Sequence, residues 1–264
     1  MDIYQTLQHS QRQRVSDGQW TPVLSGITGA DYTLVMVLPQ LGDFDSLEYA
    51  WLVRRGWDVL VAKGVTVRAV GIGQRESGQA FCQFTGFPAD QLWVDPTADL
   101  HRQLGLYEGL SLTIPGLTPG QRAWVNLMLM CAGIASPGTL AEVFRGYRGD
   151  RNAPQLIGDD EEIQAFPLPP LRGRFFRWAG GSGFQRPFEL ATLRLRNMAE
   201  VLGKWSTYVP DATYLTQRGG TFLFDADHRL IYEHRDRGIL DFAEHKSDPL
   251  TFLRAVASSD TALI

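Results

Sequence analysis

The sequence contains few cysteines and histidines, and it lacks any metal-binding spacing of them. Two cysteines, Cys82 and Cys131, lie far apart in a chain of 264 residues. Without a CxxC pair, a disulfide-rich secreted scaffold and a cysteine-rich zinc or iron–sulfur site are excluded. The five histidines form no HxxxH pair or other metal-ligand spacing. The sequence therefore predicts neither a metal site nor a bound cofactor.

Excess charge of one sign and long apolar runs are also missing. Lys and Arg number 25 against 29 Asp and Glu, a net charge of −4, which argues against nucleic acid as a partner. The longest near-apolar stretch, residues 123–135, falls short of the ~18 residues that a membrane-spanning helix needs. The first twenty residues hold no apolar core typical of a signal peptide. We therefore expect no transmembrane segment and a cytoplasmic location.

Strand-like and helix-like segments alternate through the first part of the chain. Aliphatic and β-branched runs predict buried strands at 32–39, 65–73 and 92–94. Helices are expected between and after them, from about 45 to 62, at 76–85, and from 97 to about 105, with Asp45 and Glu48 as a capping box of the first. A hairpin at 220–224 and 229–234 and a terminal helix containing Leu250 and Val256 follow. This order predicts βαβ units and an α/β fold.

The domain organisation expected from these patterns has three parts. Residues 1–29 are predicted to form an N-terminal helix, with Ile3, Leu7 and Val15 on its apolar face, and a loop. Residues 30–257 form the main domain, interrupted at about 109–212 by a large, mainly helical insertion, and 258–264 are a frayed tail. A segment as long as 109–212 is improbable as an unstructured loop, so we expect it to be ordered and functional.

Four segments of the insertion define its expected character. Residues 122–131 predict a helix that is apolar nearly all round, which indicates burial. A short helix is expected at 137–146, an irregular Pro-rich loop at 152–171 and a longer helix at 187–203. Aromatic residues and the arginines Arg177 and Arg186 flank a Gly-rich turn. We expect these arginines to be exposed and to face a protein partner, because charged residues are rarely buried alone.

Two sequence stretches and the order of elements carry a family resemblance. The stretches are VDPTADLHRQLGL, which begins at Val94, and GGTFLFDADHRLIYEHR, which begins at Gly219. Over residues 30–106 and 213–257 the chain resembles the peroxiredoxin-like branch of the thioredoxin superfamily, in particular the AhpC/TSA-type antioxidant proteins. The resemblance implies a thioredoxin-like sheet flanked by helices.

The turn after the first strand departs from the family pattern. In the family this turn has the form FGCPFCRE, whereas residues 41–48 here read LGDFDSLE. Asp43 thus stands where the family has its attacking cysteine, and Ser46 stands where it has its second cysteine. Asp43 is expected to cap the following helix. The resemblance also places Arg218 at the active site, where it is expected either to pair with Asp43 or to lie on the surface.

Three functions remain open at this point. The first is a catalytically degenerate protein with Asp43, Ser46 and Arg218 as a vestigial site, which acts by binding a protein partner in a redox-stress or assembly setting. The second is a thiol-dependent peroxidase or oxidoreductase that uses Cys82, although AFCQFTGF around this residue favours a buried hydrophobe. The third is a small anionic ligand bound by Arg186 and the Gly-rich turn of Gly180, Gly181, Ser182 and Gly183. The first is the leading hypothesis.

Overall fold

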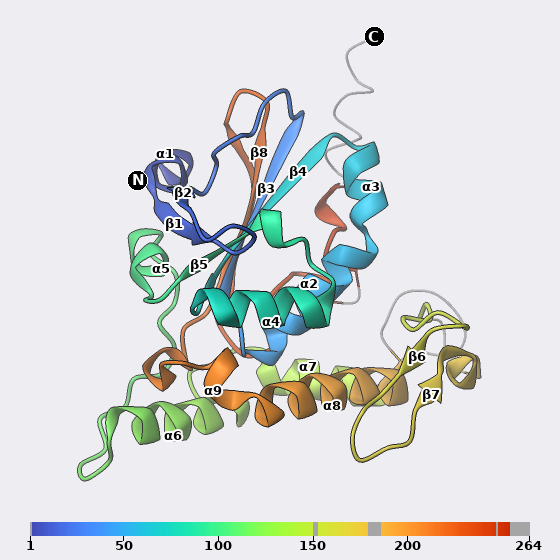
Figure 1. The fold of residues 1–264 in the computed structure, drawn as a ribbon. Helices are drawn as coiled ribbons and strands as arrows, with labels where there is room; N and C mark the ends of the chain where they lie inside the picture. Colours follow the sequence, from blue (N-terminus) through green and yellow to red (C-terminus); the bar gives the residue numbers. More distant parts are fainter. Residues whose placement is uncertain (1, 150–152, 179–185, 247, 254–264) are drawn as a thin grey trace.

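A seven-stranded mixed sheet forms the centre of the molecule (Figure 1). The computed structural model describes residues 2–149, 153–178, 186–246 and 248–253. The strand order is β2-β1-β5-β4-β3-β8-β9. The bounds are β1 Gln11–Arg14, β2 Trp20–Pro22, β3 Tyr32–Gln40, β4 Val65–Ile72, β5 Leu92–Asp95, β8 Gly220–Asp225 and β9 Leu230–Arg235.

The predicted α/β class and the thioredoxin-like sheet are confirmed. β3, β4 and β5 run parallel to one another, with Tyr32 opposite Val65 and Ala69 opposite Leu92. β8 pairs antiparallel with β3, and β9 returns beside β8 as the predicted hairpin. Eight of the nine residues of β3 are buried; this is why its continuous apolar run could be recognised as a strand covered on both faces.

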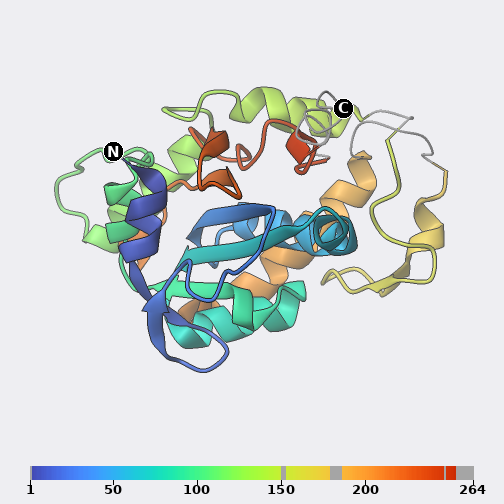
Figure 2. The ribbon, with the colours of Figure 1, turned by 90° about the horizontal axis from the view of Figure 1, so that it is seen from above.

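Alternate residues of the strands face two separate cores. Val35 and Val37 of β3 pack with residues of α1 (Ile3–His9) and α5 (Asp99–Gln103). Leu34 and Met36 face the opposite core, which α2 (Phe44–Arg55), α3 (Trp57–Ala62) and α4 (Arg75–Thr85) cover. Figure 2 shows these helices on the two sides of the sheet. The period of two along each strand therefore places helices on both faces.

The predicted helix over about 45–62 is two helices, and its predicted capping box is wrong. α2 ends at Arg55 and α3 begins at Trp57, with Gly56 between them. A Cβ atom at Gly56 would lie 2.6 Å from Cδ1 of Leu250. The absence of a side chain at Gly56 therefore leaves room for Leu250. The N-cap of α2 is Asp43 rather than Asp45.

The N-terminal segment differs from the predicted helix and loop. The helix α1 ends at His9, and β1 and β2 form a hairpin whose first strand pairs antiparallel with β5. Val15 lies beyond the helix and is fully buried. The polar sequence QRQR of β1 carries no apolar alternation; the backbone of β5 supplies the pairing that makes it a strand.

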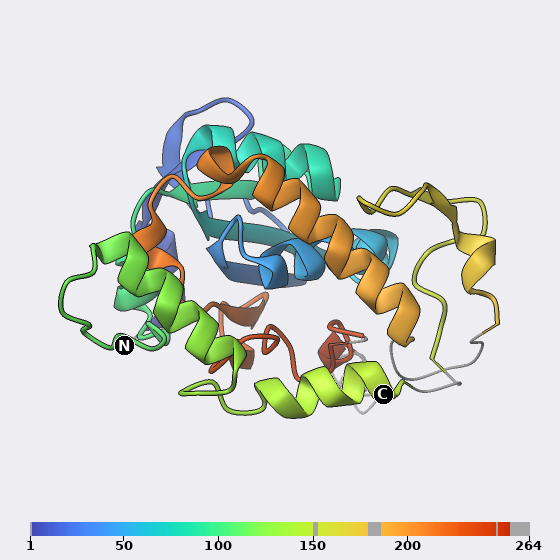
Figure 3. The same ribbon diagram turned by 90° about the horizontal axis from the view of Figure 1, so that it is seen from below.

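Residues 109–212 gather at the end of the sheet where β3 leads into α2 (Figure 1). Their helices are α6 Pro119–Cys131, α7 Thr139–Arg148, α8 Pro187–Gly203 and α9 Trp205–Tyr208, with short 3₁₀ turns at Gly173–Phe176 and Ala212–Tyr214. Seen from below, α6, α7 and α8 frame the beginning of α2 (Figure 3). The expected mainly helical character of this segment is confirmed.

One expectation within this segment is wrong, and a second holds for most of the described residues. The burial predicted for the apolar helix fails, because Trp124, Val125 and Met128 of α6 are 37%, 37% and 55% exposed. The helix lies at the edge of the fold, with one face packed inward. The expected irregular loop at 152–171 contributes two short antiparallel strands, β6 (Glu162–Ile163) and β7 (Leu171–Arg172).

The end of the chain is only partly described. Leu253 is buried against the core that α2 covers, whereas Val256 and the predicted frayed tail 258–264 lie outside the described residues. Within the described ranges, no helix has both the length and the apolar character needed to cross a membrane.

Candidate functional site

The turn between β3 and α2 presents a carboxylate at the beginning of a helix. Asp43 is the N-cap of α2, with extended backbone, and its Oδ1 accepts a hydrogen bond from the backbone N–H of Asp45 at 2.9 Å. A side-chain oxygen here satisfies one of the free N–H groups of the first turn. The negative charge also lies at the positive end of the helix dipole. The expected capping role of Asp43 therefore matches the geometry.

Arg218 lies beneath this turn and is completely buried. Its Nη2 donates to Oδ2 of Asp43 at 2.5 Å, and its Nη1 lies 3.6 Å from Oδ2 of Asp45. Two backbone carbonyls, of Leu215 and Thr216, accept its other hydrogen bonds. The expected surface position of Arg218 is thus wrong, and the alternative, an ion pair with Asp43, is what the structure contains.

Two further carboxyl groups surround the same guanidinium. Asp45 and Asp236 are 3% and 4% exposed. Burial raises the pKa of Asp45 to about 7, reinforced by Asp43 and opposed by Arg218. Burial also raises the pKa of Asp236 well above its usual range, with Arg218 again opposing. Three carboxyl groups therefore lie close to one buried cation, and burial favours the protonated form of two of them, Asp45 and Asp236.

Ser46 takes a structural position. It is 1% exposed, and its hydroxyl donates to the backbone carbonyl of Gln40 at 2.9 Å. This bond joins the first turn of α2 to the end of β3. The geometry gives Ser46 a role in holding the turn, with its hydroxyl directed at the backbone.

A cavity of about 250 Å³ opens beside the turn and is lined mostly by apolar side chains. Its lining comes from α2, α6, α7, α8, α9 and the segment after β9: Gln40, Gly42, Asp43, Phe44, Asp45, Glu48, Trp124, Leu127, Met128, Cys131, Thr139, Val143, Arg194, Trp205, Leu215, Ile239 and Leu240. We call it the turn cavity. Among these lining residues, Met128 is exposed and Asp45 is buried.

Residues of 109–212 make most of the apolar wall of the turn cavity. The indole rings of Trp124 and Trp205 stack with centroids 5.0 Å apart. Arg194 of α8 pairs with Glu48 of α2 through two contacts, at 2.9 and 3.3 Å. Glu48 is buried, so this pair connects the segment firmly to the beginning of α2. The segment therefore completes the cavity over the turn between β3 and α2.

The two cysteines lie in different surroundings. Cys131 of α6 lines the turn cavity, and burial, then Asp43 and Asp45, raise the pKa of its thiol. Cys82 of α4 is half-buried against the core and does not line this cavity. Burial raises the pKa of Cys82 to about 12. Both environments disfavour the thiolate, the form that attacks peroxides and disulfides.

The predicted anion site is only partly described. Gly180, Gly181, Ser182 and Gly183 lie outside the described residues. Arg186 is 2% exposed, against the expectation of exposure, and its Nε donates to Glu189 at 2.8 Å. Glu189 accepts further bonds from the backbone N–H groups of Leu156 and Ile157. An acidic partner three residues along the chain therefore explains the buried arginine.

Exposed aromatic side chains gather near this buried pair. Phe175, Trp178 and Phe188 line a hollow of about 480 Å³, with ring centroids 4.9 Å apart for Phe175 and Trp178 and 5.9 Å for Phe175 and Phe188. Trp178 is 82% exposed. Arg177 is exposed as expected and pairs with Asp159. We call these three aromatic residues the aromatic surface.

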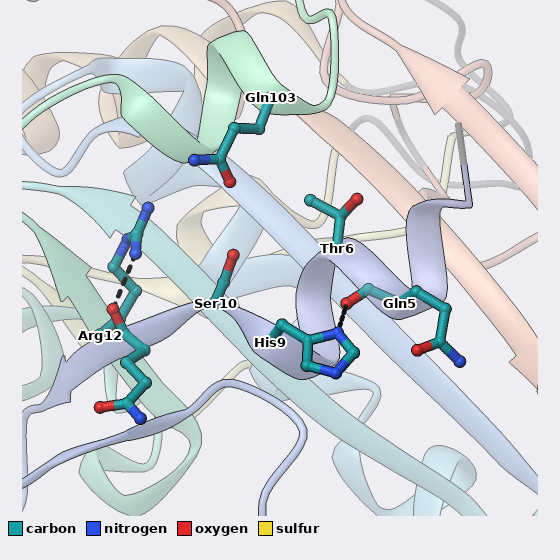
Figure 4. A pocket seen from close by; sticks show the side chains of 7 residues that line it. Gln5, Thr6, His9, Ser10, Arg12 and Gln103 are labelled. Carbon is teal, nitrogen blue, oxygen red and sulfur yellow. Dashed lines mark hydrogen bonds between the residues drawn. The ribbon is translucent and has the colours of Figure 1, made fainter.

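A third hollow, of about 520 Å³, lies between α1, β1 and α5 (Figure 4). Its polar lining includes the exposed Gln5, His9 and Gln103. His9 is hydrogen-bonded to the carbonyl of Gln5 at 2.8 Å, and Arg12 is held by Asp95. His9 and Arg12 are therefore engaged by neighbouring groups. Among the described residues, no group of three or more His, Cys, Asp or Glu is placed to hold a metal.

The sequence interpretation missed several residues of the turn cavity. The sequence predicts a capping role for Asp45 and a place in a buried helix for Cys131. That both line one cavity depends on tertiary packing. Arg194 gave one signal, since it is a charged residue beside apolar neighbours on its helix. Nothing in the local sequence of Asp236 indicates its position beside Arg218.

The family model for the AhpC/TSA antioxidant enzyme matches residues 51–238, which begin after the turn of Asp43. A solved structure, a cysteine-to-serine mutant of peroxiredoxin Q from Xanthomonas campestris, is similar with 12% identity and a TM-score of 0.42. That likeness covers 92% of this chain and 88% of the other. No curated protein matches the sequence. The chain belongs to the AhpC/TSA antioxidant enzyme family.

Proposed function

We propose that this chain is a catalytically degenerate member of its family that acts by binding a protein partner, in a redox-stress or assembly setting. One observation carries the proposal: a carboxylate occupies the helix N-terminus and is neutralised there by the buried Arg218. A carboxylate cannot attack a peroxide and be regenerated by a thiol. The cation that would stabilise a thiolate is engaged by Asp43 and Asp45.

Neither native thiol compensates for this replacement. A nucleophilic cysteine needs a lowered pKa and access to its substrate. Burial is the largest influence on both Cys82 and Cys131, and it raises the pKa in each case. Cys131 reaches the turn cavity, but Asp43 and Asp45 oppose its ionisation. This electrostatic setting supports a binding role over a peroxidase role.

The experiment is a peroxidase assay with the purified protein. Hydrogen peroxide consumption is followed with dithiothreitol as reductant, for the wild type and for Cys82→Ser, Cys131→Ser and the double variant. We expect all four proteins to match the reductant alone. Turnover by the wild type that either single substitution abolishes would overturn the degenerate assignment and identify the thiol responsible.

The aromatic surface supports the choice of a protein as the partner. Large exposed aromatic side chains dominate binding energy at protein interfaces, and Trp178 and Phe188 are 82% and 52% exposed. Capture from an extract of the source cells is compared for the wild type and Trp178→Ala/Phe188→Ala. The matched control is Phe144→Ala, an aromatic residue 62% exposed on α7. Loss of a specific protein only with the double variant is expected; equal capture by all three contradicts this surface.

A further inference from the structure

Acidic groups outnumber basic groups around the turn cavity. Asp43, Asp45 and Glu48 line it, and Asp236 lies behind them beside Arg218. The two cations here are Arg194 and Arg218. Arg194 is engaged by Glu48, and Arg218 donates its shortest bond to Asp43. Asp45 therefore lines the cavity and shares the positive charge of Arg218 with Asp43.

A second polar group of the cavity lining, the side-chain carbonyl of Gln40, receives no hydrogen bond. Gln40 is 2% exposed and lines the cavity, and its Oε1 has no hydrogen-bond partner. Its Nε2 donates to the backbone carbonyl of Asp211, which fixes the orientation of the amide. An unsatisfied buried acceptor is costly unless something donates to it.

A backbone hydrogen bond holds the carboxyl group of Asp45 in position. Its Oδ2 accepts a 2.6 Å bond from the backbone N–H of Leu240. Leu240 has φ of 59°, a left-handed conformation that is rare for a bulky side chain. Strained backbone of this kind persists where surrounding structure enforces it and is common at ligand sites.

The remaining wall is apolar and compact. Leu127, Val143, Leu215 and the stacked Trp124 and Trp205 supply most of it. A volume of about 250 Å³ lies just below the roughly 300–1,000 Å³ of pockets for drug-sized ligands. The cavity thus suits a small apolar body with one polar end directed at Asp45 and Gln40.

We propose that the turn cavity binds a small apolar amine, with its ammonium group donating to Asp45 and Gln40 and its apolar body against the tryptophan pair. The proposal extends the proposed function, since it requires that the former catalytic position now serves binding. An ammonium group supplies both the missing positive charge and the missing donor. A carboxylate ligand would add to the acidic excess, and a neutral alcohol would supply a donor without charge.

Ionisation of Asp45 is coupled to the groups that face it. These are Asp43 and Glu48 on its own helix, Arg218 and Asp236 beside β8 and β9, Arg194 on α8, and Cys131 on α6. Burial holds part of the Asp45 population protonated near neutral pH. A bound cation favours the ionised form, so amine binding is expected to release a fraction of a proton at pH 7.

The test compares three ligands of one shape: cyclohexylmethylamine, cyclohexylmethanol and cyclohexanecarboxylate. Binding is measured by calorimetry and by intrinsic tryptophan fluorescence, in phosphate and in Tris buffer at pH 7. We expect the amine to bind at least about tenfold more tightly than the alcohol, with no binding of the carboxylate. The heat is expected to differ between buffers in the direction of proton release. Equal or weaker binding of the amine, or no binding at all, overturns the proposal.

Two variants assign the binding to Asp45. Asp45→Asn keeps an oxygen for the N–H of Leu240 and removes the charge, so the amine is expected to bind about tenfold more weakly without proton release. The control Asp90→Asn removes a carboxylate that does not line the cavity and is expected to bind as the wild type does. If Asp45→Asn does not fold, the three-ligand series with the wild type decides the proposal. Failure here leaves the peroxidase result intact, so the two proposals fail separately.

Discussion

At the scale of single residues, Asp43 combines two stabilising roles that different substitutions separate. It caps α2 and pairs with the buried Arg218. Asp43→Asn keeps a good cap and removes the charge, whereas Asp43→Ala removes both. We expect the Asn variant to lose about 3 kcal/mol of unfolding free energy, because removing one partner of a buried ion pair is costly even where a second carboxyl group, Asp45, remains near Arg218. The Ala variant should lose about 1 kcal/mol more.

Urea unfolding of the three proteins at one pH measures both differences. Asp45 remains 3.6 Å from Nη1 of Arg218, so the loss is expected near the lower end for buried pairs. An Asn variant as stable as the wild type would mean that Asp45 and Asp236 neutralise Arg218 alone. An Ala variant equal to the Asn variant would mean that the cap contributes nothing.

The raised pKa of Asp45 predicts that the unfolding free energy falls as the pH rises from about 4 to about 7. Its pKa is about 7 in the folded protein and about 3.9 when unfolded, so the folded state holds the proton more tightly. Stability contributed by the protonated group is therefore present below about pH 4, declines as pH rises to about 7, and stays low above that. Relative to wild type, Asp45→Asn should gain stability across this window by at most about 4 kcal/mol.

The measurement is urea unfolding of both proteins at several pH values from 4 to 8.5. His101 acts in the opposite direction, because burial lowers its pKa to about 4 and stability is lost as pH falls. It is present in both proteins, so its contribution cancels in the difference. A difference that is flat between pH 4 and 7 would show that Asp45 titrates normally.

At the scale of elements, apolar patterns predict the central strands and the main helices. Polar strands and the contacts between elements could not be predicted from these patterns. The run YTLVMVLP predicts β3 because a strand covered on both faces is continuously apolar. The polar β1 gave no such signal, since its pairing is decided by β5. The close packing of Leu250 against Gly56, nearly two hundred positions apart along the chain, could not be predicted from local sequence.

The close approach of the end of α9 to the turn between β3 and α2 leads to a prediction about packing. A Cβ at Gly42 would lie 2.7 Å from Cγ2 of Val209, the residue after α9. We expect Gly42→Ala to lower the unfolding free energy by about 1–3 kcal/mol through overpacking. The matched control is Gly203→Ala at the end of α8, where nothing lies within 4 Å of an added Cβ. That substitution should stabilise by about 0.4–1 kcal/mol.

Thermal unfolding of both variants checks the pair. Opposite shifts of the melting temperature are expected, because the two glycines differ in the space around them and not in chemistry. A Gly42→Ala protein that melts with the wild type would mean that α9 can move away from the turn at little cost.

At the scale of the whole molecule, the candidate site joins groups that are distant in sequence. The family resemblance directed attention to Asp43, Ser46 and Arg218, and the ion pair between the first and third spans 175 positions. The other residues of the turn cavity could not be assigned from sequence, because α6, α7 and α8 reach the turn only through packing. Arg186 shows the same limit: its burial depends on Glu189 and on backbone groups of a separate loop.

At the scale of the whole fold, we expect a thiol introduced at position 43 to have a lowered pKa. In Asp43→Cys the thiolate would lie at the N-terminus of α2 above the buried Arg218, and both features favour the negative form. Three proteins are compared, each with one cysteine: Asp43→Cys/Cys82→Ser/Cys131→Ser, Cys131→Ser and Cys82→Ser. Alkylation by iodoacetamide is followed from pH 5 to 10.

The introduced thiol is expected to reach half its maximal rate below about pH 7.5. Cys82 should react only at much higher pH, since burial raises its pKa to about 12, and Cys131 should react above its ordinary range for the same reason. A shared pH profile for all three proteins would mean that the environment of the turn no longer favours a thiolate. The surrounding carboxyl groups, Asp45 and Asp236, would then outweigh Arg218 and the helix N-terminus at this position.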